Sequence, residues 1–155
     1  MATQTFIPIG TVTFTSQSTI TFGSLPQDYT HLFISIQGQA STTSNMLMRM
    51  NGDATSGNYN VLRFYAFGGG SSSDSGTSSG MELGNTYANQ GNIQIDLFDY
   101  TATDAWKFAL VKNTFNNSLF YQADQWTETN AVSSLTFETT SGTFSGTITV
   151  YGLHG

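Results

Sequence analysis

The chain has 155 residues, of which 9% are charged, and its four Lys and Arg against ten Asp and Glu give a net charge of -6. This acidic balance argues against nucleic acid or an anionic membrane surface as a partner, because both are bound through concentrated positive charge. The absence of cysteine excludes disulfides, thiolate catalysis and Cys-ligated metals, and no apolar run approaches the roughly 18 residues of a membrane span.

The composition predicts an all-β fold, in a single domain over residues 1–155. The 24 Thr and the 14% of aromatic residues suit the pleated, half-buried surface of strands, whereas the helix formers Glu and Lys are scarce. The charged fraction is far below the ~25% of ordinary soluble domains, which suggests that much of the surface faces other protein or is wetted by neutral polar residues. The opening "MATQTFIPIG" lacks the basic start of a signal peptide, so we expect no secretory route.

The first half of the chain predicts five strands, recognised by apolar residues at every second position. In one of them, for example, Met46, Met48 and Met50 alternate with Leu47 and Arg49. The turn residues after this strand, "NGD" and "SGN", predict a hairpin connection to the next. The five segments are residues 6–14, 19–22, 31–37, 45–50 and 58–67.

Residues 68–80 predict a long, flexible loop, because eleven of these thirteen residues are Gly or Ser. A linker between two domains is the alternative, but the segments on either side each lack a full set of strands. We therefore expect one domain that contains a long loop. Loops of this length are uncommon inside a compact domain and are often functional or mobile.

The second half of the chain predicts five more strands, and no segment shows a sustained helical period. Short strands joined by turn residues are typical of sandwiches and barrels. We therefore predict a two-sheet antiparallel β-sandwich, jelly-roll-like, with a strand order that the sequence does not define. The five segments are residues 92–100, 105–112, 118–126, 131–139 and 142–155.

The last strand carries apolar residues almost to the end of the chain. Phe144 to Val150 alternate between apolar and polar, and Tyr151 and Leu153 then place apolar groups on the opposite face. We expect this strand to pair between earlier strands, so that the end of the chain is part of the core. Gly152 and Gly155 permit close backbone approach at the rim.

The two histidines do not belong to a catalytic motif. His31 alternates with core positions on a strand, which favours a structural role, and His154 suits the surface or an interface. No Ser-His-Asp set, phosphate-binding loop or pair of glycosidase carboxylates stands out. We therefore expect a non-enzymatic protein with no catalytic residues, no cofactor and no metal.

An acidic stretch at residues 96–104 offers the one alternative to a metal-free protein. Oxygen-rich loops bind Ca²⁺, and Asp96, Asp99 and Asp104 lie close together in the sequence. Their spacing does not match an EF-hand loop, and the glycine needed for its sharp turn is missing. We interpret Asp99 and Asp104 as turn residues and keep Ca²⁺ as the weaker alternative. The segment around Asp53 raises the same question with less support.

The tryptophans raise the possibility of carbohydrate binding, because sugars stack on exposed aromatic faces. Tyr100 lies near Trp106 in the sequence, and Tyr121 lies near Trp126. Trp106 alternates with apolar residues on its strand, which favours core packing. Trp126 ends a strand, where a side chain can be exposed.

Four stretches resemble the small structural proteins of tailed bacteriophage particles. They are "STITFGSLPQDYTHLFISI" at 18–36, "MNGDATSGNYNVLRFYAFG" at 50–68, "IQIDLFDYTATDAWKFA" at 93–109 and "WTETNAVSSLTFETTSGTFSGTITVYGLHG" at 126–155. The chain ends Tyr151-Gly152-Leu153-His154-Gly155, with Leu in place of the commoner Ile of that family and His where Lys is frequent. The four matches occur in the family's order and leave out the Gly/Ser segment.

The resemblance implies a virion component with a β-sandwich fold. By this analogy we expect a capsid decoration (cement) protein, made in the host cytoplasm and bound to the outer head surface of the virion. Its partners would be the major capsid protein and further copies of itself, in a homotrimer. We expect a mainly polar, backbone-rich contact surface with Tyr or Phe anchors near its centre. The alternative is a tail or baseplate module that binds host-surface carbohydrate.

Overall fold

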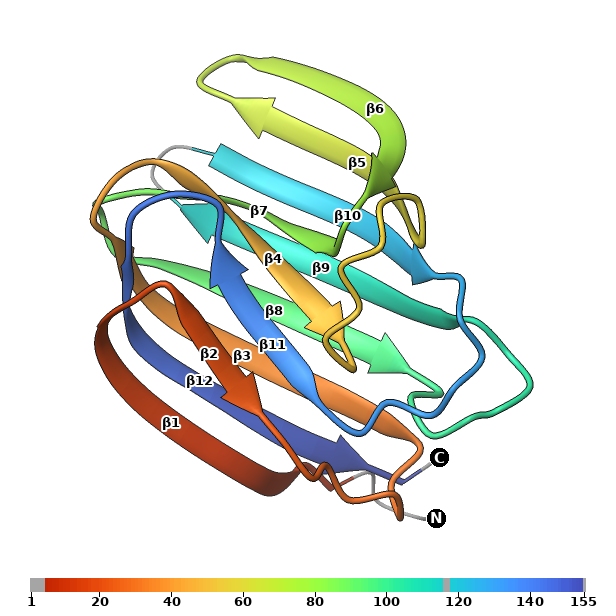
Figure 1. Ribbon diagram of the computed structural model, residues 1–155. Helices are drawn as coiled ribbons and strands as arrows, with labels where there is room; N and C mark the ends of the chain where they lie inside the picture. Colours follow the sequence, from red (N-terminus) through yellow and green to blue (C-terminus); the bar gives the residue numbers. More distant parts are fainter. Residues whose placement is uncertain (1–4, 116–117, 155) are drawn as a thin grey trace.

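The computed structural model describes residues 5–115 and 118–154, and these residues form two antiparallel sheets without any helix (Figure 1). One sheet has eight strands, in the order β1-β12-β3-β8-β9-β10-β5-β6, and the other has four, in the order β2-β11-β4-β7. The strands are β1 Ile7–Gln17, β2 Thr19–Phe22, β3 His31–Ala40, β4 Ser44–Met50, β5 Tyr59–Phe67, β6 Gly70–Ser78, β7 Met81–Thr86, β8 Gly91–Phe98, β9 Lys107–Phe115, β10 Ser118–Trp126, β11 Leu135–Thr139 and β12 Phe144–Leu153.

The predicted β-sandwich is confirmed, and its strand order is that of a jelly roll. The four strands β1-β12-β3-β8 match the four strands β2-β11-β4-β7 position by position, each pair being consecutive in the chain. The chain therefore winds through both sheets as a folded ribbon, which is the double Greek key of a jelly roll. The strands β9, β10, β5 and β6 are added at one edge of the larger sheet.

The apolar core lies between the two sheets. Alternate residues of β3, β8 and β12, among them Ile34, Ile95 and Ile148, are fully buried and belong to one cluster with Met48 and Phe137 of the smaller sheet. This period of two follows from the pleat, which turns successive side chains to opposite faces. Hydrophobic burial between the sheets is thus the main favourable contribution to folding.

The prediction of a loop over residues 68–80 is wrong for residues 70–78. These residues form β6, which pairs along its whole length with β5, from Tyr59 opposite Ser78 to Phe67 opposite Gly70. β6 is an exposed edge strand, so its side chains need no core to enter. Backbone hydrogen bonds to β5 are sufficient to place it, and a Gly/Ser composition does not reveal that partner.

The predicted hairpin between residues 45–50 and 58–67 is also wrong. The first segment is β4 of the smaller sheet, and the second is β5 of the larger sheet. The ten expected strands are all present within the described residues, and β6 and β7 are additional. The sequence signal for turn residues is the same whether the chain turns back or crosses to the other sheet.

The end of the chain is part of the core, as expected. β12 lies between β1 and β3, with Ile148 opposite Ile36 and Val150 opposite Ile34. Gly152 lies against the ring of Tyr29, where an added Cβ would come within 2.4 Å of a ring atom. Gly155 lies outside the described residues. In the described part of the chain, no helix is long and apolar enough to cross a membrane.

A matched pair of valine substitutions tests the burial of β12. Val150 is fully buried, whereas Val12 on the edge strand β1 is exposed. We expect Val150→Ala to lower the free energy of unfolding by about 2 kcal/mol or more, because it removes apolar contacts and leaves a cavity. Val12→Ala should change it by less than about 0.5 kcal/mol. Denaturant unfolding measures both, and equal losses would contradict a buried β12.

Candidate functional site

The loop between β4 and β5 is organised by Asp53. Its carboxylate accepts hydrogen bonds from Trp126 Nε1 at 2.8 Å, Asn58 Nδ2 at 2.9 Å and the Thr55 N–H at 2.9 Å. Burial acts to raise the pKa of Asp53, but these hydrogen bonds outweigh burial and hold the pKa well below its ordinary value. Because protein donors already occupy this carboxylate, the geometry gives it a structural role.

Other residues in the four stretches that resemble phage structural proteins also form hydrogen bonds between loops. Asn51 Oδ1 accepts hydrogen bonds from the N–H groups of Ser133 at 2.8 Å and Ser134 at 3.2 Å. The hydroxyl of Tyr100, a fully buried residue, donates to the Pro26 carbonyl. These contacts join loops that follow different strands at one end of the sandwich (Figure 1). The resemblance thus rests largely on residues that fix the connections between strands.

The structure corrects the expectation for Trp106 and defines the position of Trp126, which the sequence left open. Trp126 is buried, at 2% exposure, where its indole N–H donates to Asp53 and its ring stacks on Tyr59. Trp106, expected in the core, is 53% exposed. Of the tyrosines near them, Tyr121 is exposed.

Lys107 explains why the face of Trp106 was assigned wrongly. The inward face of β9 begins with Lys107, which is fully buried and donates from Nζ to the carbonyls of Ala105 at 2.7 Å and Thr129 at 3.1 Å. Burial lowers the pKa of this ammonium group. A charged residue at the start of a strand normally lies on the solvent face, and its burial here places Trp106 and Phe108 on the exposed side.

The histidines have the roles that the sequence suggested. His31 is half-buried on β3, and its Nδ1 accepts a hydrogen bond from the Asp99 N–H at 3.0 Å. This contact fixes the turn that follows β8. His154 is exposed, with its ring centroid 4.8 Å from that of Tyr29.

The structure does not bring Asp96, Asp99 and Asp104 together as a calcium site. Asp96 lies on the strand β8 and forms an ion pair with Lys112 at 3.5 Å. Asp99 has φ 52°, and its carbonyl accepts a turn hydrogen bond from the Ala102 N–H at 3.0 Å. Within residues 5–115 and 118–154, no three acidic or histidine side chains are grouped so that they could hold a metal ion.

The side of the larger sheet that faces away from the smaller sheet, here called the outer face, is apolar over the added strands. On β5, β10 and β9, Leu62 lies in register with Ala123 and then Leu110, and Phe64 lies in register with Tyr121. The large apolar side chains on this part of the face are 38% to 58% exposed. They are Leu62, Phe64, Phe108, Leu110, Leu119 and Tyr121.

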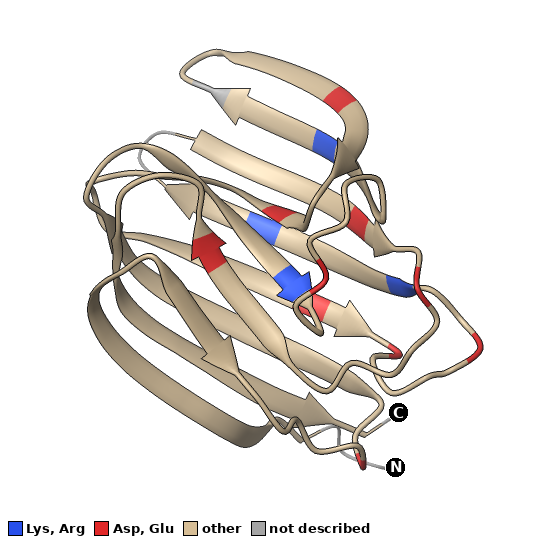
Figure 2. Ribbon diagram, viewed as in Figure 1, with Lys and Arg blue, Asp and Glu red and all other residues tan. Residues whose placement is uncertain are grey.

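Charge is nearly absent from the outer face. The strands β1, β3 and β12 contain no Lys, Arg, Asp or Glu (Figure 2). Their outward side chains include threonines in cross-strand hydrogen bonds, such as Thr13 to Thr147 at 3.0 Å. On β8 and β9, the outward charges Asp96 and Lys112 pair with each other. The outer face is thus a broad, neutral surface that combines aliphatic, aromatic and hydroxyl groups.

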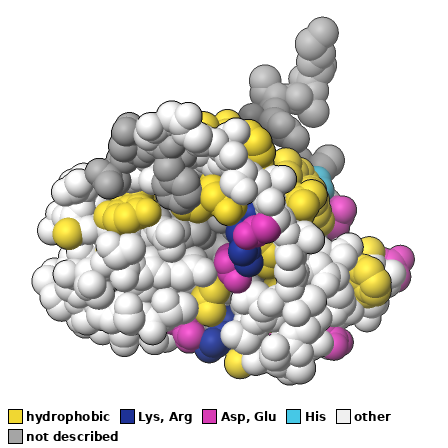
Figure 3. Space-filling view, turned by 90° about the horizontal axis from the view of Figure 1, so that it is seen from above, with side chains coloured by type: hydrophobic (Ala, Val, Ile, Leu, Met, Phe, Trp, Pro, Cys, Tyr) yellow, Lys and Arg dark blue, Asp and Glu magenta, His cyan; other side chains and the backbone are white. Residues whose placement is uncertain are grey.

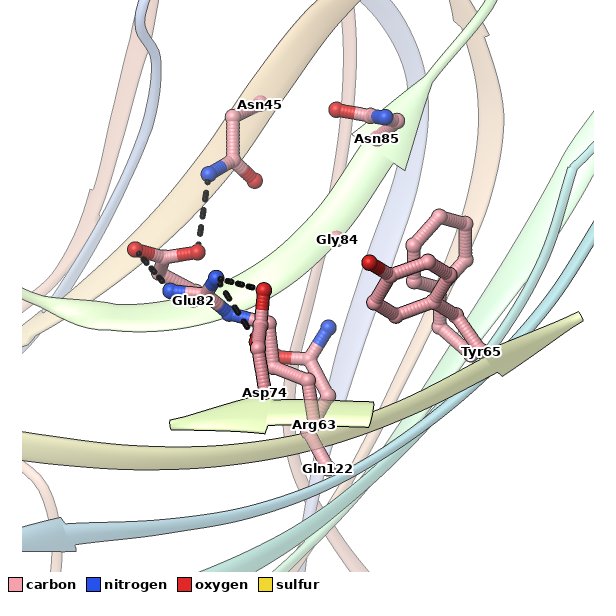
Figure 4. Close-up of a pocket in the computed structure, with 9 residues that line it drawn as sticks. Asn45, Arg63, Tyr65, Asp74, Glu82, Gly84, Asn85 and Gln122 are labelled. Carbon is pink, nitrogen blue, oxygen red and sulfur yellow. Dashed lines mark hydrogen bonds and ion pairs between the residues drawn. The ribbon is translucent and has the colours of Figure 1, made fainter. Parts of the chain in front are cut away.

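A cluster of charged side chains lies on the other side of the added strands. Viewed from above, basic and acidic groups meet near the middle of a surface that is otherwise mostly uncharged (Figure 3). There, Arg63 of β5 forms ion pairs with Asp74 of β6 at 3.1 Å and with Glu82 of β7 at 2.9 Å. The Asn45 amide nitrogen donates to Glu82 at 3.2 Å (Figure 4).

These residues line a cavity of about 330 Å³, here called the polar pocket. It lies between the added strands and the edge strand β7 of the smaller sheet, and Figure 4 shows side chains from both sides pointing into it. Its lining residues are Asn45, Arg63, Tyr65, Asp74, Glu82, Gly84, Asn85, Phe120 and Gln122.

Buried amides hold β7 against the larger sheet beside the polar pocket. Asn113 of β9 donates from Nδ2 to the carbonyls of Leu83 at 2.6 Å and Asn85 at 3.2 Å. Gln122 satisfies both ends of its amide when its nitrogen donates to the Glu82 carbonyl and its oxygen accepts from the Gly84 N–H. Gly84 has φ +83°, and an added Cβ would come within 2.8 Å of Asn113 Nδ2. Only glycine therefore fits this part of the wall without strain.

Asp124 lies beneath this region and is fully buried. Neither of its carboxyl oxygens has a hydrogen-bond partner among the described residues. Burial, with a further contribution from the negative charge of Glu82, raises the pKa of Asp124 to about 8. The raised pKa favours the neutral, protonated form of this carboxyl, because an ionised carboxylate in the interior beside Glu82 would be costly.

Sequence reasoning missed the polar pocket because two of its walls were not predicted as strands. Asp74 lies in the segment expected to be a loop, and Glu82 belongs to the unpredicted β7. One signal was present in the sequence. Gln122 and Asp124 alternate with Phe120 and Trp126 on the inward face of β10, so polar residues occupy core positions there.

No model of a known protein family matches the chain, and no curated protein matches its sequence.

The raised pKa of Asp124 predicts a pH-dependent stability. The folded-state pKa of about 8 exceeds the ordinary value of roughly 3.9, so the folded protein binds the proton more tightly than the unfolded chain. The contribution of this group is complete below pH ~4 and is lost as pH rises through about 8. We expect Asp124→Asn, which cannot ionise, to gain stability relative to the unmodified protein between pH 5 and pH 9. A difference in unfolding free energy that does not change with pH would contradict the assignment.

Proposed function

We propose that the protein is a non-enzymatic structural component of a bacteriophage virion, a capsid decoration protein that binds the outer head surface and stabilises the shell. Its partners are the major capsid protein and further copies of itself in a homotrimer. Two lines support this proposal: the four stretches that resemble phage structural proteins, and the neutral outer face of the larger sheet.

The neutral outer face is the observation that carries the proposal. Contiguous exposed apolar side chains on a protein surface mark interaction sites, and the centres of protein interfaces are depleted of charge and enriched in aromatic residues. The apolar side chains on β5, β9 and β10 fit this composition, with Phe64 and Tyr121 as neighbouring aromatic anchors. The threonine-rich strands β1 and β12, towards the other edge of the same sheet, supply polar, uncharged surface.

A repeating shell suits a surface of this kind. Each contact of a trimer with the lattice adds to the others through effective concentration, so each interface can be modest. A protein that binds only the intact lattice stabilises it by mass action. The outer face adds little electrostatic repulsion of its own, because its outward charges Asp96 and Lys112 pair with each other.

The second candidate is a tail or baseplate module that binds host-surface carbohydrate. Exposed rings favour it, because Trp106 and Tyr121 present aromatic faces on which sugars can stack. The two candidates differ in copy number: a head decoration protein is present in hundreds of copies per particle, and a tail module in a handful.

The decisive experiment compares phage heads with and without the protein. We expect bound protein to raise the temperature at which the heads release DNA, and densitometry of purified virions to give hundreds of copies per particle. Equal release temperatures together with a handful of copies would contradict the cement role and favour the tail module.

Substitutions on the outer face test which surface docks. The double variant Phe64→Asp and Leu110→Asp places two charges on the neutral face, and we expect it to bind heads at least about tenfold more weakly, because charge at the centre of an interface must be desolvated. Asn130→Asp adds a charge in an exposed loop and serves as the control. Unimpaired binding by a folded double variant would place the docking surface elsewhere.

A further inference from the structure

The polar pocket has the size and position of a small-ligand site. Its volume of about 330 Å³ lies at the lower end of the range for ligand pockets, roughly 300–1,000 Å³. It lies on the side of β5 and β6 opposite to the outer face, so a ligand there does not compete with docking through that face. Its walls come from both sheets, where the added strands meet β7.

The charged side chains of the polar pocket are one guanidinium and two carboxylates, which give a net charge of -1, and both carboxylates are paired with the guanidinium. The Arg63 guanidinium lies between the carboxylates of Asp74 and Glu82, at 3.1 Å and 2.9 Å. An anionic ligand would lie near two carboxylates, and a cationic ligand would lie near the guanidinium. Both would carry a desolvation cost that the paired side chains are not free to offset. A neutral ligand avoids this cost.

Two polar atoms of the lining are buried and have no partner among the described residues. Asn45 donates from its amide nitrogen to Glu82, and its Oδ1 is unpaired. Arg63 uses its two terminal nitrogens in the ion pairs, and its Nε is unpaired. The first atom needs a donor and the second needs an acceptor. A hydroxyl group can supply both functions, since it donates one hydrogen bond and accepts others.

An aromatic wall completes the polar pocket. The rings of Tyr65 and Phe120 pack together with their centroids 5.8 Å apart, and both residues line the cavity. In Figure 4 the Tyr65 side chain lies on the opposite side of the cavity from Asn45. The ligand is therefore offered amide and guanidinium groups on one side and an apolar ring surface on the other.

We propose that the polar pocket binds a neutral sugar residue. A pyranose has hydroxyl groups around its edge and an apolar C–H face, and these match the amide and arginine groups and the aromatic wall respectively. The Asn113 and Gln122 amides fix β7, and the two ion pairs fix Arg63, so the site is formed before the ligand arrives. A preformed site lowers the entropic cost of binding.

The test is a titration of the full chain with individual monosaccharides, followed by isothermal calorimetry and by NMR saturation transfer. The neutral probes are glucose, galactose, mannose and N-acetylglucosamine, and the charged probes are glucosamine and glucuronic acid. We expect at least one neutral sugar to bind with a Kd of about 1 mM, in the range of small polar ligands. We expect both charged probes to bind at least about tenfold more weakly.

Variants assign the binding to the polar pocket. We expect Asn45→Ala and Tyr65→Ala to weaken sugar binding at least about fivefold, the usual effect of one lost hydrogen bond or ring contact. Gln94→Ala removes an amide from a separate polar depression beside Lys112, on the opposite side of the larger sheet, and should leave binding unchanged. Asn85→Ala provides another lining variant if Asn45→Ala does not fold, as thermal unfolding would reveal.

The outcomes are decisive in both directions. Absence of binding by all four neutral sugars at tenfold above the expected Kd would overturn the proposal. So would binding that the folded lining variants leave intact, or charged sugars that bind as well as neutral ones. Loss of sugar binding in variants that still attach to phage heads would support the proposal and separate it from the docking function.

Discussion

The larger sheet has twice as many strands as the sheet that covers it, and this difference in width governs the rest of the structure. Opposite β2, β11, β4 and β7, the inner face is apolar and dry, because two layers of side chains bury each other. At the edge strand β7, polar side chains of β5, β6 and β10, among them Arg63, Asp74 and Gln122, take part in the lining instead. The polar pocket lies where the apolar interior between the two sheets ends.

Buried polar groups then connect the layers that apolar packing alone would leave free to slide. Asn113 and Gln122 bind the backbone of β7, Lys107 binds two loop carbonyls, and Asp53 binds the indole of Trp126. Each bond has a defined direction, so these contacts specify how the sheets and loops are aligned, whereas apolar burial mainly drives collapse. Asp124 differs from the rest, because burial keeps it protonated and its oxygens unpaired.

The neutral outer face and the charged polar pocket lie on opposite sides of the larger sheet, and the two proposals give them different functions. Few charged side chains lie on the outer face, so contacts there depend on shape and apolar area. These properties suit a repeated docking surface of the kind proposed. In the polar pocket the Arg63 guanidinium is paired with both carboxylates, which suits the neutral, polar ligand proposed. Because the two surfaces lie on opposite sides of β5 and β10, the proposed docking and the proposed ligand binding do not compete for the same residues.

The sequence by itself determined the all-β class, ten of the strands and the core role of the last strand, because a period of two depends only on neighbouring residues. It also indicated the structural role of His31. Tertiary structure decided the remainder. The Gly/Ser segment became β6 because β5 offers it hydrogen bonds, which side-chain composition does not report. Trp106 was expected in the core and is exposed, and the position of Trp126 was open, because a period of two gives two faces without saying which is inner. The choice of face depends on partners distant in the chain, such as the Thr129 carbonyl for Lys107 and the carboxylate of Asp53 for Trp126.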